Sequence, residues 1–251
     1  MNNRTRNEFL GKWKRYFGNA ELPITFYYTD EEGRAELAKR ASGHECIIDT
    51  LSRVRSGESL AFSVNSLGCF GARRYLGFTE KAGPDFEYFL SCGIPGKLEG
   101  ERYKKSPELV RAMLRNAPKF KAPGKYIVFK RWDKLKEIDE PEVVIFFAKF
   151  DVLSGLFTLA NFDEVDSNGV TSPFGSGCNS IVQYPYLEKD NPEPRAILGM
   201  FDVSARPYVG ENVLTLAIPF AKFKRMVDNM DESFLITESW KEVLRRINRK
   251  T

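Results

Sequence analysis

One apolar run limits the fold of this chain more than any other feature of its sequence. Residues 143–147 read Val-Val-Ile-Phe-Phe, without a polar side chain among them. A strand with one face in water alternates apolar and polar residues, whereas a strand buried on both faces is apolar throughout. The run therefore predicts a central strand that is covered on both faces.

Other runs predict the elements around this strand. Further strands are expected at 23–28, 60–64, 126–129, 196–201 and 213–218, the last two paired. Helices are expected at 5–17, 31–40, 46–57, 152–160 and 220–230, and after the capping residues Ser106 and Thr237. The elements do not follow a regular strand–helix–strand rhythm, which favours an α+β fold over a doubly wound one. We predict one compact α+β domain over residues 1–251, with a mixed, largely antiparallel sheet covered by helices.

Two stretches of the chain repeat one pattern, which is Ser, four residues, Gly-Cys, five residues and Tyr. The copies are Ser63, Gly68, Cys69 and Tyr75, and then Ser172, Gly177, Cys178 and Tyr184. A β-prone run leads into each copy and a helix-compatible run follows it. We interpret them as related loops that each place a cysteine where a helix begins. They predict two related halves, roughly residues 20–118 and 119–235.

The position of these cysteines predicts their chemistry. A thiol at a helix N-terminus lies at the positive end of the helix dipole, which lowers its pKa and makes thiolate available. We expect this for Cys69 and Cys178, and for Cys46 in the first turn of a helix that Ser42 to Glu45 opens with capping-box spacing. Thiolate is a nucleophile and a soft metal ligand, so the three thiols could hold an iron–sulfur cluster or another soft metal. Their spacings match no compact metal motif and do not indicate convergence.

The thiols also have a simpler explanation. Free cysteine is among the most buried residue types, so each could be a small core side chain. We favour this explanation for Cys46 and Cys92, while for Cys69 and Cys178 the repeated context leaves both explanations open.

The residues around the cysteines carry further alternatives. Gly68 and Gly177 would allow the backbone to approach a bound group closely. Arg206 could clamp a carboxylate or phosphate, or it could form a salt bridge with Asp202. Tyr184 follows its cysteine by six residues, which is not the same face of a regular helix, so packing at the edge of the core is the simpler expectation.

The single histidine, His44, excludes several enzyme classes. Sites that need two histidines from one chain, such as HExxH zinc proteases and facial-triad iron oxygenases, cannot be built. The motifs GxSxG, GxxxxGK[ST] and GxGxxG are also absent. Neither a nucleophile elbow, a phosphate-binding loop nor a standard dinucleotide fingerprint is therefore supported.

Charge and hydropathy limit the partners. The formal net charge is +4, from 38 basic and 34 acidic side chains, which makes nucleic acid an unexpected partner. No apolar run approaches the ~20 residues that span a bilayer, so no membrane partner is expected. We see no signal peptide, and four cysteines without one suggest reduced thiols in the cytoplasm.

Several short motifs together resemble a known family. They are Cys46 before a helix ending in Gly57-Glu58, Cys69-Phe70-Gly71 before Leu76-Gly77, Gly124-Lys125-Tyr126, Pro141 to Ala148, Gly177-Cys178 with Tyr184-Pro185-Tyr186, and Arg206 before Leu216-Ala217-Ile218-Pro219. In order and spacing they resemble the prokaryotic family called domain of unknown function 169. The family usually has a glycine pair where this chain has Gly71-Ala72. The resemblance implies no established activity. It implies that Cys46, Cys69, Cys178, Tyr184 and Arg206 are the positions that matter.

We therefore expect a cytoplasmic protein that binds a small-molecule ligand, either a small cofactor or a soft metal, between the two Gly-Cys loops. The cofactor site would use Cys69, Cys178, Gly68, Gly177, Arg206 and Tyr184, and a metal would add Cys46. The alternative is an enzyme with Cys69 or Cys178 as its nucleophile or redox thiol. The sequence leaves catalysis and a homo-oligomer open.

Overall fold

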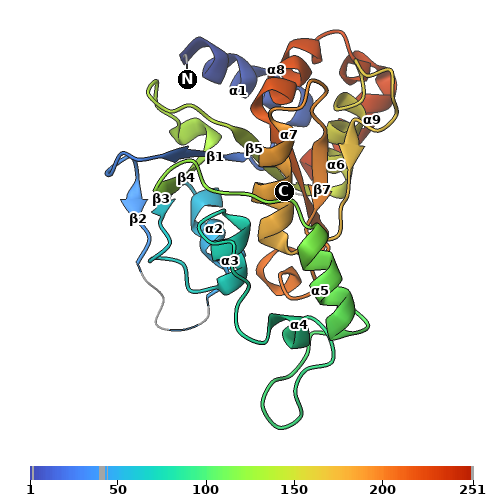
Figure 1. Ribbon diagram of the computed structural model, residues 1–251. Coiled ribbons are helices and arrows are strands. Elements are labelled where there is room, and N and C mark those ends of the chain that lie inside the picture. The colour runs from blue at the N-terminus through green and yellow to red at the C-terminus, as the bar shows by residue number, and fades with distance from the viewer. Residues whose placement is uncertain (2, 40–42, 44, 250–251) are drawn as a thin grey trace.

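The computed structural model describes residues 1, 3–39, 43 and 45–249, and its helices and strands interleave along the chain (Figure 1). The strands are β1 (Ile24–Thr29), β2 (Glu36–Leu37), β3 (Ser59–Phe62), β4 (Tyr126–Arg131), β5 (Val143–Lys149), β6 (Val170–Thr171), β7 (Ala196–Gly199) and β8 (Val213–Pro219). The α-helices are α1 (Asn3–Phe17), α2 (Ile47–Arg55), α3 (Phe70–Tyr75), α4 (Phe86–Phe89), α5 (Pro107–Asn116), α6 (Phe150–Leu159), α7 (Tyr184–Glu188), α8 (Phe220–Asn229) and α9 (Glu238–Arg249). A π-helix, η2 (Asn179–Gln183), leads into α7, and short 3-10 turns lie at η1 (Trp132–Lys134), η3 (Arg206–Tyr208) and η4 (Phe234–Ile236).

The strands form one mixed sheet in the order β2-β3-β4-β1-β5-β8-β7-β6. Only the outer pairs β2·β3 and β6·β7 are parallel, and the other pairs are antiparallel. Strand β5 pairs with β1 on one side and β8 on the other, and its first six residues are buried. The predicted α+β fold and its central apolar strand are confirmed.

The same strand pattern occurs twice in this sheet. Strands β1 to β4 are arranged 2-3-4-1, and β5 to β8 are arranged 6-7-8-5, with β1 and β5 meeting at the centre. The predicted division of the chain into halves after residue 118 stays a prediction. In the sheet, the first copy of the strand pattern ends at Arg131 and the second begins at Val143. The first copy extends past residue 118 because β4 pairs with β1, a contact between residues about 100 positions apart.

Each face of the sheet has its own core, because residues of β5 alternate between the two sides. Val144 and Phe146 point to a core beneath α1, α6, α8 and α9, which gather at one end of the molecule in Figure 1. Val143 and Ile145 point to a second core beneath α2, α3 and η2. Trp13 of α1 lies in the first core, with its ring centroid 5.1 Å from that of Phe146. Burying such a side chain contributes about 1.5–3 kcal/mol.

Two local expectations were wrong. Residues 36–37, expected within a short helix, form β2, because this edge segment pairs with β3. The helix expected from residue 46 begins at Ile47, and Cys46 is its N-cap in extended conformation. Ser42 of the expected capping box and the histidine, His44, lie outside the described residues.

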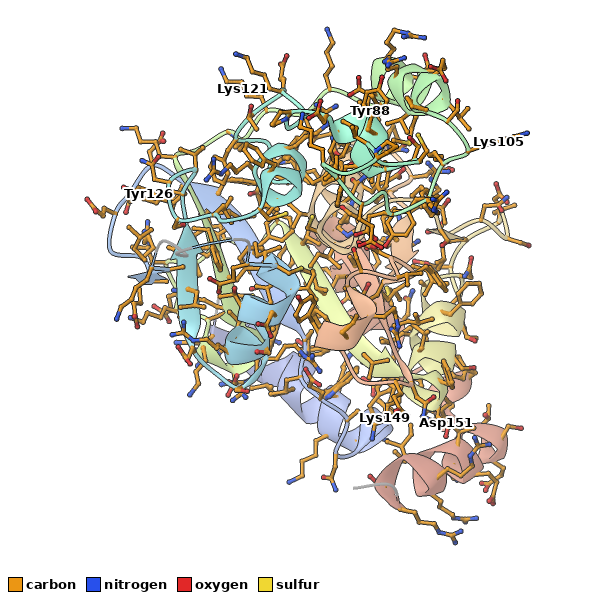
Figure 2. All side chains as sticks on the ribbon, turned by 90° about the horizontal axis from the view of Figure 1, so that it is seen from below. Tyr88, Lys105, Lys121, Tyr126, Lys149 and Asp151 are labelled. Atoms are coloured by element: carbon orange, nitrogen blue, oxygen red, sulfur yellow. The ribbon has the colours of Figure 1, made fainter. Side chains whose placement is uncertain are left out.

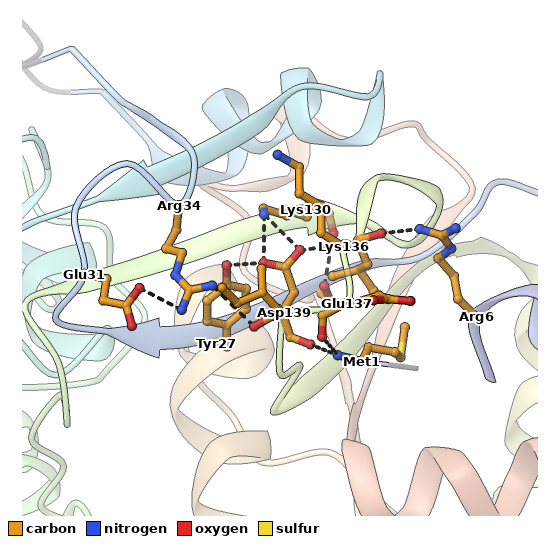
Figure 3. A network of polar contacts seen from close by, with 12 residues as sticks. Met1, Arg6, Tyr27, Glu31, Arg34, Lys130, Lys136, Glu137 and Asp139 are labelled. Carbon is orange, nitrogen blue, oxygen red and sulfur yellow. Dashed lines mark hydrogen bonds and ion pairs between the residues drawn. The ribbon is translucent and has the colours of Figure 1, made fainter. Parts of the chain in front are cut away.

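A buried ion pair joins β4 to the loop before β5 (Figure 3). The Nζ of Lys130 lies 2.8 Å and 2.9 Å from the two carboxylate oxygens of Asp139, and both side chains are almost fully buried. The Tyr27 hydroxyl and the Lys136 N–H also donate to this carboxylate. Burial alone would raise the pKa of Asp139, but these hydrogen bonds outweigh burial and lower the pKa below its ordinary value.

We expect Asp139→Asn to lower the free energy of unfolding at pH 7 by about 3–5 kcal/mol, because it leaves a buried lysine charge without its partner. Urea denaturation measures this loss. Glu238→Gln, which removes one partner of the exposed pair with Lys241, is the control and should change stability by less than about 1 kcal/mol.

The same pair predicts a pH dependence. Because the pKa of Asp139 is lower in the folded state, its contribution is full above the unfolded value of about 3.9 and is lost as pH falls through the folded value. The stability difference between the wild type and Asp139→Asn should therefore shrink below about pH 4. A difference that is constant from pH 7 to pH 3 would contradict this assignment.

Candidate functional site

A cavity of about 740 Å³ lies beside the second core, and we call it the thiol cavity. Its walls come from the starts of α2, α3 and η2, from α4 and α5, and from residues 201–208. Cys46, Cys69 and Cys178 all line it, so three thiols that are far apart in the sequence border one hollow. All four cysteines of the chain are free thiols.

The structure pairs these cysteines differently from the sequence repeat. Helix α2 runs from the edge strand β2 to its parallel neighbour β3, and η2 with α7 runs from β6 to β7 in the same way. Cys46 is the extended N-cap of α2, and Cys178 lies in helical conformation directly before η2, so both cysteines lie at the starts of these two corresponding connections. Cys69 caps α3, which follows β3 instead. The sequence repeat therefore does not mark structurally corresponding positions.

The contact between α2 and η2 is close. A Cβ atom at Gly177 would lie 3.2 Å from Cγ1 of Ile48 and 3.0 Å from Cβ of Ala205, so any side chain there would crowd both neighbours. Glycine at this position allows the start of η2 to pack against the first turn of α2. Gly177 also lines the thiol cavity, whereas Gly68 is not among the residues of its wall.

The pKa shifts of two thiols have the opposite sign from the expectation. Burial raises the pKa of Cys178 well above its ordinary value, and the neighbouring Cys69 and Cys46 raise it further. Burial likewise raises the pKa of Cys46, against the lowering effect of helix N–H groups. Both groups are therefore neutral thiols at pH 7, and the prediction of ready thiolates at these two positions was wrong.

The polar groups of the thiol cavity centre on Asp202. Its carboxylate accepts hydrogen bonds from the N–H of Gly177 at 3.0 Å, from the hydroxyl of Tyr103 at 3.2 Å, and from the N–H and hydroxyl of Ser204 at 3.1 Å and 2.9 Å. Asp202 thereby joins three loops in the cavity wall. The sequence contains one signal for this role, which is an Asp two residues before a Ser. An Asp side chain often accepts a hydrogen bond from the backbone N–H two residues later in the chain.

The π-helix brings further polar side chains to the wall. Asn179 and Gln183 both line the thiol cavity from η2. Gln183 donates to the carbonyl of Pro118 at 3.1 Å, but Oδ1 of the buried Asn179 has no hydrogen-bond partner. A buried acceptor without a partner costs about 1–3 kcal/mol, and π-helical turns occur frequently at functional sites. Sequence reasoning missed both residues because a π-turn has no distinct sequence pattern.

Both tyrosines of the sequence repeat, Tyr75 and Tyr184, line the thiol cavity together with the cysteines. Tyr75 also packs against the second core, as expected for a residue at the core edge. Tyr184 donates from its hydroxyl to the carbonyl of Phe174 at 3.3 Å and so holds the loop before Cys178. Burial raises the pKa of Tyr75.

Arg206 does not reach the thiol cavity. Its guanidinium donates to the backbone carbonyls of Gly210, Glu211 and Val213, and it is not among the residues of the wall. The arginine closes the turn before β8 and forms no ion pair with Asp202, while the anion clamp stays a prediction.

The rest of the wall is apolar and aromatic, and part of it is open to solvent. Phe70 is 54% exposed, Phe174 59% and Phe201 52%, and all three line the thiol cavity. Large exposed apolar groups gathered at one place mark interaction or ligand-binding sites. These residues carry no sequence signal, since only tertiary structure shows which aromatic side chains remain outside the core.

The described residues lack two kinds of feature. Within residues 1, 3–39, 43 and 45–249, no three His, Cys, Asp or Glu side chains are placed to hold a metal ion together. None of the helices formed by these residues combines the length and the apolar character needed to cross a bilayer.

Comparison with known proteins identifies the family. The model of the family DUF169, described as "Uncharacterised ArCR", matches residues 15–229. Because this match spans most of the chain, the protein belongs to DUF169, and the resemblance expected from its motifs is confirmed. No curated protein and no solved structure matches the chain.

The burial of the thiols predicts their order of reactivity. Cys92, which is exposed, should react with iodoacetamide at pH 7.5 at least tenfold faster than Cys178, which is buried and has a raised pKa. Peptide mass spectrometry after timed alkylation measures each rate. Labelling of Cys178 should accelerate above pH 9 or on unfolding, and equal rates at both sites in the native protein at pH 7.5 would contradict the assignment.

Proposed function

We propose that this protein binds a small, largely apolar organic molecule in the thiol cavity. The observation that carries the proposal is the cavity itself, with its volume of about 740 Å³ and its wall of aromatic and aliphatic side chains. Ligand-binding sites are concave, mostly apolar and about 300–1,000 Å³ in volume, with a few polar groups that orient the ligand. The thiol cavity has each of these properties.

The polar groups suggest how such a ligand would be oriented. Oδ1 of Asn179 is an acceptor without a partner, so a hydroxyl or N–H group on the ligand would satisfy it. Asp202 already accepts several hydrogen bonds, and its role in this proposal is to hold the wall. Cys46, Cys69 and Cys178 would then serve as soft contacts, as free cysteines do in protein interiors.

The same observations lower the support for the other functions. A soft-metal site would need its ligands grouped, and no such group occurs among the described residues. A thiol enzyme with Cys178 as nucleophile would need a thiolate at neutral pH, and burial raises the pKa of this group. An enzyme with Cys69 as its nucleophile stays a prediction, and we propose binding of an organic ligand as the function that the cavity supports best.

A neutral fluorescent probe tests the proposal. N-phenyl-1-naphthylamine should bind saturably, with one molecule per chain and an increase in fluorescence. Cys69→Trp fills part of the thiol cavity and should weaken binding at least tenfold. Cys92→Trp makes the same exchange at an exposed position outside the wall and should leave binding unchanged.

Circular dichroism and the melting temperature establish that each variant is folded. If Cys69→Trp does not fold, Met113→Trp narrows the thiol cavity from α5 in its place. A folded cavity-filling variant that binds the probe as well as the wild type does would contradict the proposal. So would the absence of saturable binding to the wild type.

A further inference from the structure

A second cavity, of about 380 Å³, lies directly beside the thiol cavity, and we call it the side cavity. Arg74, Leu114, Ala117, Pro118 and Gln183 belong to the walls of both. The two hollows therefore share part of their walls. A molecule seated in the thiol cavity has only to extend past these shared residues to enter the side cavity.

The side cavity differs from its neighbour in charge. Its wall contains the cations Arg74, Arg115 and Lys119 and a single carboxylate, that of Glu80. One guanidinium nitrogen of Arg74 donates to the backbone carbonyl of Glu80. Arg115 and Lys119 are exposed, and among the described residues neither has an ion-pair partner. The wall is therefore positively charged, and the side chains of Arg115 and Lys119 offer hydrogen-bond donors to a ligand.

The surrounding segment has the same sign. Residues 97–125, which form the loop before α5, this helix and the chain after it, contain nine basic and three acidic residues. Their net charge of six exceeds the net charge of four of the entire chain. The segment that borders both cavities thus has a clear excess of positive charge. Such an excess attracts anionic ligands.

We propose that the ligand is an anionic amphiphile. Its apolar tail lies in the thiol cavity, and its phosphate or carboxylate head lies in the side cavity between Arg74, Arg115 and Lys119. This inference rests on the proposed function, since the tail occupies the site proposed there. Arginine suits such a head group, because its planar guanidinium donates two parallel hydrogen bonds to a carboxylate or phosphate.

The test compares ligands that share a tail and differ in their heads. Dodecyl phosphate, dodecanoate and dodecanol, each below its aggregation concentration, compete with N-phenyl-1-naphthylamine for the wild-type protein. We expect at least one of the two anions to displace the probe at a concentration at least tenfold lower than dodecanol. The stronger of the two identifies the head group. Inorganic phosphate alone should not displace the probe, because it lacks the tail.

Two double variants with the same change of charge locate the head. Arg115→Gln with Lys119→Gln removes two cations from the wall of the side cavity and should abolish the tenfold preference for the anion. Lys105→Gln with Lys121→Gln removes two cations that project from the surface of the protein and belong to neither wall (Figure 2). This control should retain the preference. An equal loss in both would show general attraction and overturn the proposal.

The possible failures are distinguishable. If dodecanol and the anions compete equally well, the head-group inference fails and the apolar site stands. If the probe itself does not bind, the proposed function fails. Sedimentation with phosphatidylglycerol vesicles, without any displacement by the dissolved amphiphiles, would overturn the inference in favour of binding to a lipid surface.

Discussion

The antiparallel pairing of β1 with β5 is the contact on which the rest of the structure depends. Three residue pairs, Ile24 with Ile145, Thr25 with Val144 and Phe26 with Val143, join the two four-strand sets into one sheet. Antiparallel neighbours are related by an approximate two-fold rotation, so helices in corresponding positions lie on the same face. This places α2 and η2 side by side and brings Cys46 and Cys178 to one cavity.

Burial, rather than the helix dipole, decides the chemistry of these thiols. A helix N-terminus stabilises a negative charge by about 0.3–1 kcal/mol at exposed positions. Full burial shifts a pKa by up to 3–5 units, and each unit corresponds to about 1.4 kcal/mol. At Cys178 burial is therefore the larger effect, and the pKa rises. At Cys46 burial likewise outweighs the lowering effect of the helix N–H groups.

The two cavities place two kinds of surface next to each other. The wall of the thiol cavity has three cysteines, many aromatic rings and charged groups of both signs, whereas the side cavity has three cations and one carboxylate. Leu114, Ala117 and Pro118 of the shared wall come from the end of α5 and the chain just after it, so one short segment shapes both hollows. In this segment, Ser106 is the N-cap of α5, and its hydroxyl oxygen accepts a hydrogen bond from the N–H of Leu109. The position of this segment therefore affects both proposed parts of the site.

The sequence by itself determined the elements and the family. The apolar run at 143–147 predicted the central strand, and Ser106 with Pro107 predicted the start of α5, because these signals act over a few residues. Cys69, Cys178, Gly177 and Tyr184 were also found from sequence, and all four line the thiol cavity.

Only the tertiary structure decided which of these residues correspond, what surrounds them and where the charge gathers. In the tertiary structure, Cys46 corresponds in position to Cys178, and Arg206 forms hydrogen bonds within a turn. Asp202 and Asn179 lie in the cavity wall. These outcomes depend on strand order and on contacts between residues about 100 positions apart, such as β1 with β4. A local pattern of residues contains no information on such contacts, because they form only when all strands assemble into one sheet with a core on each face.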